Sequence, residues 1–137
     1  MSLLAEPESR NIFGSVHGGW ILRQVDQAAY VCAARHAGHQ AVTASIDRVD
    51  FRSPVQIGNL VTFRAEVHYV GRTSMVIGVR VEAEDLLSGE VRHTNTCVLT
   101  FVAIDHDFRP IGVPGLLRES DEEERLWREA RERRERA

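Results

Sequence analysis

A single helix pattern followed by several long strand patterns is the feature that most constrains the fold of this chain. From Gly18 to about His36, apolar residues recur at the i, i+3, i+4, i+7 spacing of a helix with one buried face. Gly38 is placed to end that helix, in the left-handed position that glycine often takes there. The apolar members of the pattern are Ile21, Leu22, Val25, Ala28, Ala29, Cys32 and Ala33.

Four strand-like runs follow the helix and are separated by turn signals containing Gly, Pro, Ser and Asn. They are Ala41–Phe51, Leu60–Val70, Thr73–Ala83 and Thr94–Ile104. The second and third runs alternate apolar and polar residues, which is typical of a sheet with one face on the core. The last run is apolar at nearly every position and favours a central strand covered on both faces. We therefore predict an α+β fold in which one long helix packs on an antiparallel meander.

The surface of this predicted sheet is too large for one helix. A helix of about 18 residues can lie across one face of the sheet but cannot cover both. The second face and the sheet edges then need a partner, so the sequence predicts an obligate dimer or a larger homo-oligomer.

The two ends of the chain differ from its middle. Residues 1–10 have no regular pattern and are predicted to be a mobile lead-in to a single domain over residues 11–117. Residues 118–137 form a charged helical tail with 7 Arg and 8 acidic residues. This tail is either a solvated, partly frayed helix or a docking helix that uses Leu126 and Trp127. Its interleaved glutamates argue against a nucleic-acid patch.

Composition excludes several classes of function. The net charge is −3, so neither nucleic acid nor an anionic membrane is predicted as a partner. All 17 basic residues are Arg, which excludes a Schiff-base or P-loop lysine. No signal-peptide pattern and no apolar stretch of about 18 residues occur. Cys32 and Cys97 are expected to be buried free thiols in a reducing compartment, which predicts a cytoplasmic protein.

The start of the helix and one carboxylate within it are candidates for chemistry. Gly18 and Gly19 leave backbone N–H groups bare at a helix N-terminus, which can bind developing negative charge. The alternative is that these glycines only allow tight passage of the backbone beside a strand. Asp26 lies near the apolar boundary of the helix and is either a general base or a surface residue paired with Arg23 or Tyr30.

Helix geometry separates these candidates. Asp26 is seven residues beyond Gly19, so its backbone lies about 10 Å further along the axis. If both act on the same bond, they come from two chains. Asn11, just before the helix, offers an amide to such a site or merely holds a turn. His17 either donates to a ligand or has a structural role.

One turn between strands could hold a phosphate. Arg72, Thr73 and Ser74 follow Gly71, so a guanidinium and two hydroxyls adjoin an open backbone. The alternative is an ordinary hairpin turn. The six histidines and two cysteines show no metal-ligand spacing, so no metal is predicted.

Together these residues resemble the hotdog-fold acyl-CoA thioesterases, in particular the branch of bacterial and brain-type long-chain acyl-CoA hydrolases. The resemblance covers about residues 10–116 and leaves out the charged tail. It rests on N-x-x-G-x-V-H-G-G from Asn11 to Gly19, Asp26, Ala34-Arg35-His36, Val42-Thr43, Asp50-Phe51-x-x-Pro54-Val55-x-x-Gly58, Gly71-Arg72-Thr73-Ser74, Thr100 to Asp105 and Val113-Pro114. It implies a single hotdog domain, with a long central helix on a five- to six-stranded antiparallel sheet.

The resemblance also implies an oligomer and roles for individual residues. Two subunits join their sheets edge to edge, with the dimer as the minimal unit and a hexamer, a trimer of dimers, as a larger form. Asn11 of one chain and Asp26 of the other act on the thioester, whose carbonyl the Gly19 N–H polarises. Coenzyme A, part of the substrate rather than a cofactor, meets Arg72, Thr73 and Ser74. The residues expected to line the substrate pocket are His17, Gly18, Tyr30, Thr43 and Phe51.

Two positions depart from the pattern of the family that this chain resembles. His17 stands where many bacterial members have an aromatic residue. Tyr30 replaces a small residue and would shorten or reshape the acyl pocket.

The sequence thus predicts hydrolysis of acyl-CoA to a carboxylic acid and CoA, with Asp26 as general base or nucleophile. The alternative is a non-catalytic acyl-CoA-binding or sensing protein, which would keep the turn at Arg72 without needing Asp26. A second rival is a structural subunit that binds a protein through its charged tail. A dehydratase is disfavoured because no suitable Asp/His pair is present.

Overall fold

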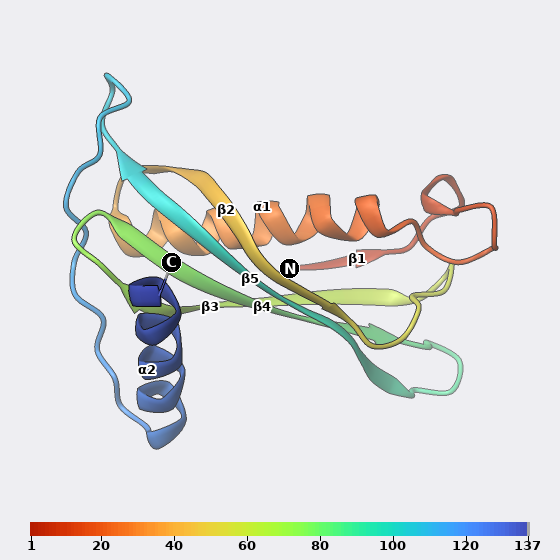
Figure 1. Cartoon of the computed structure of the whole chain (residues 1–137). Coiled ribbons are helices and arrows are strands. Elements are labelled where there is room, and N and C mark those ends of the chain that lie inside the picture. Colours follow the sequence, from red (N-terminus) through yellow and green to blue (C-terminus); the bar gives the residue numbers. More distant parts are fainter. Residues whose placement is uncertain (137) are drawn as a thin grey trace.

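A five-stranded antiparallel sheet carries a helix on each of its faces (Figure 1). The computed structural model describes residues 1–136. In chain order the elements are β1 (Ser2–Leu4), a short 3-10 helix (Pro7–Ser9), α1 (Gly18–Ala37), β2 (Gln40–Phe51), β3 (Leu60–Val70), β4 (Ser74–Glu84), β5 (Val91–Ile104) and α2 (Asp121–Arg136). A long helix on an antiparallel sheet, followed by a C-terminal helix, confirms the predicted fold class.

Helix α1 lies along one face of the sheet (Figure 1). Its apolar stripe is buried, with Val25, Ala29 and Ala33 fully inaccessible to solvent. The helix ends at Gly38, whose φ of 71° is the left-handed conformation that was expected at this position. Near the start of the helix, the rings of Trp20 and Phe63 pack with their centroids 6.4 Å apart. The prediction that the apolar stripe of this helix is buried against the core is therefore confirmed.

The strand order is β1-β3-β4-β5-β2. Strands β3, β4 and β5 form the predicted meander, but β2 does not continue it. After β2 the chain crosses from one edge of the sheet toward the opposite edge, where it forms β3. Strand β2 instead pairs antiparallel with β5. Strand β2 is therefore an edge strand. A meander prediction failed here because local patterns do not show which strands become neighbours.

The first residues of the chain also differ from the prediction. Residues 1–10 were expected to be a mobile lead-in, whereas Ser2–Leu4 pairs with Leu60–Thr62 as edge strand β1. Ala5 is buried, and its backbone bonds to the loop before β3. A strand of three residues is too short to show a period-2 pattern, and for this reason β1 was not predicted.

Helix α2 docks on the face of the sheet opposite α1. Val76 and Val98 point to this face and form a small apolar cluster with Ala130 of α2. The rings of Trp127 and Tyr69 lie 5.4 Å apart between their centroids, and the guanidinium of Arg118 lies 4.1 Å from the Trp127 ring centroid. Of the two predicted alternatives for the tail, the docking helix is therefore correct.

The two cysteines are free thiols, as expected: Cys97 is buried and Cys32 half-buried. Burial raises the pKa of both thiols above its usual value. Within residues 1–136, no helix has both the length and the apolar character needed to cross a bilayer. A cytoplasmic location stays a prediction.

Candidate functional site

Asp26 and Thr43 are joined by a direct hydrogen bond between α1 and β2. The Thr43 hydroxyl donates to Oδ1 of Asp26 at 2.7 Å. The carboxylate is half-buried and, within residues 1–136, is bonded by neither Arg23 nor Tyr30, which were the surface alternatives. Its second oxygen has no hydrogen-bond partner in the same part of the chain. The result is a carboxylate held through one oxygen while the other can accept a proton or attack a carbonyl.

Thr43 reaches Asp26 because of the way β2 is paired. Thr43 lies opposite Phe101, a core residue of β5 on the α1 side of the sheet. The β2 pairing is irregular directly after Thr43, where the register shifts before Ser45. Such bulges bend a strand and re-aim its side chains. The sequence suggested both residues as site residues, but not the bond between them.

The start of α1 is capped by a side chain. His17 is the N-cap residue, and its Nδ1 accepts a hydrogen bond from the Gly19 N–H at 3.2 Å. The N–H that was predicted to polarise a carbonyl is thus already satisfied within the chain. The Gly18 N–H, by contrast, has no acceptor among the described residues. His17 thus caps the helix here, and its expected contact with a ligand stays a prediction.

The two glycines are not required by packing. A Cβ on Gly18 would lie 3.8 Å from the Phe51 ring, and one on Gly19 would lie 3.4 Å from the His17 ring. These are ordinary or slightly tight contacts, and neither glycine has a positive φ. The alternative of tight backbone passage therefore finds no support. The two glycines add no side chain of their own to this end of the helix, where the ring of His17 is the cap.

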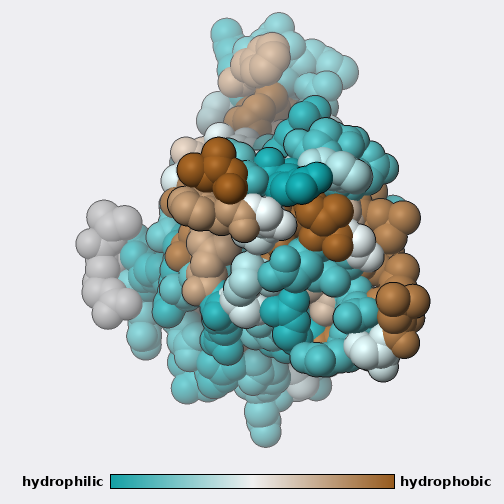
Figure 2. Space-filling view, turned by 90° about the vertical axis from the view of Figure 1, so that its right-hand side faces the viewer, coloured by the Kyte–Doolittle hydropathy of each residue, from teal (hydrophilic) through white to brown (hydrophobic). Residues whose placement is uncertain are grey.

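Asn11 organises the loop before the helix. Its Oδ1 accepts hydrogen bonds from the backbone N–H groups of Phe13 at 2.8 Å and Ser15 at 3.2 Å. This is the turn-holding alternative. The loop presents Ile12 and Phe13 to solvent with 92% and 85% of their surface exposed. Hydrophobic residues reach the surface at this end of the molecule (Figure 2), which is typical of a surface that contacts another chain.

One protomer does not bring the predicted catalytic residues together. Asn11, His17 and Gly18 line a surface cavity of about 560 Å³, and Asp26 is not among its lining residues. Phe51 lines a neighbouring cavity of about 380 Å³, also beside Gly18. Tyr30 lies one turn beyond Asp26 and is partly exposed. The site residues thus fall into two groups, one at the helix start and one around Asp26.

The turn at Arg72 is only partly open. Arg72 is exposed, but its carbonyl accepts the Val113 N–H at 3.1 Å, and the Thr73 carbonyl accepts the Ala103 N–H at 3.0 Å. The Ser74 side chain is buried, and its hydroxyl lies 3.4 Å from Nη2 of Arg134 in α2. The sequence did not indicate Arg134, because no local pattern connects the tail to this turn. Among the described residues, no cluster of His, Cys, Asp and Glu could hold a metal ion.

Comparison with known proteins identifies the family. A family model described as the thioesterase superfamily matches residues 13–90. Protein VdlD of Helicobacter pylori is 38% identical over 98% of this chain and 77% of its own length.

Solved structures agree with this match. An apo hexameric acyl-CoA thioesterase superposes with a TM-score of 0.96 at 38% identity, covering 99% of this chain and 87% of the other. An acyl-CoA hydrolase from Staphylococcus aureus, solved with butyryl-CoA and CoA, has a TM-score of 0.91 at 34% identity over 99% and 83% of the two chains. Alanine variants of that enzyme at an Asp, an Asn and a Thr also match.

Proposed function

The chain belongs to the hotdog-fold acyl-CoA thioester hydrolases of the thioesterase superfamily, and from that premise we propose that it cleaves acyl-CoA with Asp26 at sites shared between two subunits. The products are a carboxylic acid and CoA. The observation that carries the proposal is the Thr43–Asp26 hydrogen bond, because it fixes a carboxylate that has no ion-pair partner within residues 1–136.

Asp26 acts on the thioester as general base on water or as nucleophile, and Thr43 positions it. Spacing supports these assignments. In the S. aureus hydrolase, the substituted Asn and Asp are 15 residues apart, and the Asp and Thr are 17 apart. Asn11, Asp26 and Thr43 have the same two separations here.

The start of α1 provides the other half of the site, from the partner subunit. The free Gly18 N–H is ready to donate to the thioester carbonyl oxygen. The Gly19 N–H becomes available once that oxygen replaces Nδ1 of His17 as its acceptor. One such donor contributes roughly 10²–10³ in rate. Asn11 keeps the loop in place through its own hydrogen bonds and, in the shared site, orients the water or the thioester carbonyl.

A dimer is the smallest unit that completes this site. Strand β2 pairs with β5 on one side, and its other side pairs with no strand within residues 1–136. It exposes Val42 and Ile46, which the β2 strand of a second subunit would cover. Hexameric relatives support a trimer of dimers as the larger form. CoA phosphates meet Arg72 and Thr73 at the β3–β4 turn. Ser74 contributes through Arg134, which its hydroxyl contacts.

Substitution of Asp26 tests the proposal directly. Asp26→Ala should lower kcat/KM for acyl-CoA by at least about 10², since the general base or nucleophile is lost. Release of free CoA thiol across a panel of acyl chain lengths measures the rate. Asp26→Asn keeps the size of the side chain and serves as the matched variant.

Circular dichroism and size-exclusion chromatography show whether each variant keeps its fold and oligomer. Unchanged turnover in both variants would remove Asp26 from the mechanism. A wild-type protein that binds acyl-CoA without releasing thiol would instead establish the non-catalytic binding alternative.

A further inference from the structure

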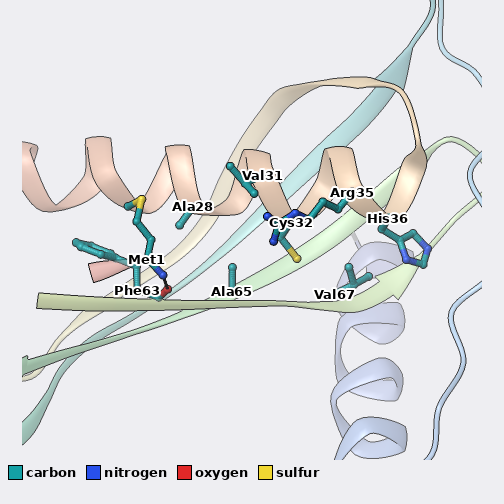
Figure 3. A pocket seen from close by; sticks show the side chains of 9 residues that line it. All are labelled: Met1, Ala28, Val31, Cys32, Arg35, His36, Phe63, Ala65 and Val67. Carbon is teal, nitrogen blue, oxygen red and sulfur yellow. Dashed lines mark hydrogen bonds between the residues drawn. The ribbon is translucent and has the colours of Figure 1, made fainter. Parts of the chain in front are cut away.

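A groove runs between α1 and β3 (Figure 3). Its volume is about 720 Å³, within the usual range for small-molecule sites. The helix contributes Ala28, Val31, Cys32, Arg35 and His36, and the strand side contributes Phe63, Ala65, Val67 and the neighbouring Met1. All but two of these side chains are apolar.

The groove exists because the sheet edge is covered only at one end. Strand β1 pairs with Leu60–Thr62, and the last contact of this edge is the Phe63 N–H donating to the Met1 carbonyl at 2.8 Å. Beyond Phe63, no strand in residues 1–136 pairs with this outer edge of β3, whose other edge pairs with β4. Ala28 and Ala65 then face one another across the gap, and their small side chains cannot fill it. The opening is therefore long, narrow and apolar.

One cation in this groove is available to a ligand. Arg35 runs along the groove toward Cys32 (Figure 3) and, within residues 1–136, has neither an ion-pair nor a hydrogen-bond partner. His36, at the end of the groove, is engaged through Nε2 with the Pro114 carbonyl at 2.8 Å. The nearby Glu66 carboxylate is bonded to His68 at 3.2 Å. The N-terminal ammonium of Met1, which also lines the groove, donates to the Phe63 carbonyl at 3.3 Å. Within residues 1–136, the Arg35 guanidinium is therefore the cationic side chain of the groove that remains open to a ligand.

We propose that this groove binds a long-chain carboxylate, the chemical class of a fatty acid, as a site separate from the catalytic one. The alkyl chain lies between Ala28 and Ala65, and the carboxylate pairs with the Arg35 guanidinium. Arg35 is nine residues beyond Asp26, which is two and a half helical turns and so the opposite side of α1. The helix separates the two ligands, and the proposal does not depend on the hydrolysis proposed above.

Displacement of a fluorescent fatty acid tests this site in the full-length protein. Dansyl-undecanoic acid should bind saturably and be displaced by laurate, but only weakly by dodecanol, which lacks the carboxylate. Arg35→Glu should weaken binding at least about tenfold, whereas Arg35→Lys should retain most of it. Arg23→Glu makes the same charge change at an exposed position of α1 outside the groove and should have no effect.

Two further variants locate the alkyl chain. Ala65→Trp should fill the groove and abolish binding, while Asp26→Ala should bind the probe as the wild type does. Should Ala65→Trp fail to fold, Arg35→Glu still decides the question. The proposal is wrong if the wild type does not bind, if Arg35→Glu binds normally, or if Asp26→Ala loses the probe.

Discussion

The Thr43 hydroxyl decides how the Asp26 carboxylate is oriented. Both residues could be named from the sequence, but their contact depends on β2 lying beside the flank of α1, and that position depends on pairing with β5. The roles of Asn11 and His17 were left between two alternatives for a similar reason. Asn11 accepts from two backbone N–H groups of its own loop and His17 from one N–H in the first turn of α1, and only three-dimensional structure shows which N–H groups are in reach.

Removal of the Thr43 hydroxyl should impair the reaction without unfolding the protein. Thr43→Val keeps the shape and loses a hydrogen bond to a charged group, a contribution of about 1.5–3 kcal/mol. We expect kcat/KM to fall about 10- to 100-fold, as measured by thiol release. Thr43→Ser keeps the hydroxyl and should stay close to wild type. Equal rates for the valine and serine variants would contradict a positioning role.

The helices and long strands were largely predictable because each has a local pattern of sufficient length. Helix α1 and β3 begin and end within a residue or so of their predicted limits. Strand β1 was missed since three residues carry no periodicity. The docking of α2 was left open because its contact with Tyr69 joins parts of the chain far apart in sequence, and its charged residues outnumber its apolar ones.

Loss of the Trp127 ring should loosen α2 from the sheet. Trp127→Ala removes the aromatic contact with Tyr69 and the cation–π contact with Arg118, each contributing about 0.5–1.5 kcal/mol. The free energy of unfolding should therefore fall by about 1–2 kcal/mol, as measured by urea denaturation followed by circular dichroism. Arg128→Ala, on the exposed side of α2, should leave it unchanged. A Trp127→Ala protein as stable as wild type would show that α2 does not depend on this contact.

The fold places the two groups of site residues, one around Asp26 and one at the start of α1, on different parts of the surface. Thr43 belongs to the edge strand β2 and Asp26 lies beside it, while the loop at Asn11 precedes the start of α1. A two-fold axis beside β2 would let each subunit complete the site of the other. The sequence predicted this arrangement from the distance between Gly19 and Asp26 along the helix, from a sheet too large for one helix to cover, and from the family resemblance.

A charge on the β2 edge should therefore abolish assembly and activity together. In Ile46→Arg, two like charges would meet across a two-fold interface, and the protein should shift to a monomer in analytical ultracentrifugation. Thiol release should then fall to the level of Asp26→Ala. Leu87→Arg places the same charge on a fully exposed residue of the β4–β5 hairpin and should change neither property. An Ile46→Arg protein that remains oligomeric and active would exclude this edge as the interface.

The pairing of β2 with β5 also has a consequence for the order in which the protein is built during synthesis. Gln40 pairs with Ile104 and Phe51 with Asn95, so β2 emerges from the ribosome well before β5, the strand it pairs with in the described part of the chain. Contacts this distant in sequence form late because a long loop must first close. Helix α1 can form early, but Thr43 has no fixed place beside it until β5 has been translated. The carboxylate is thus present from the start, and its orientation is among the last features of the fold to be established.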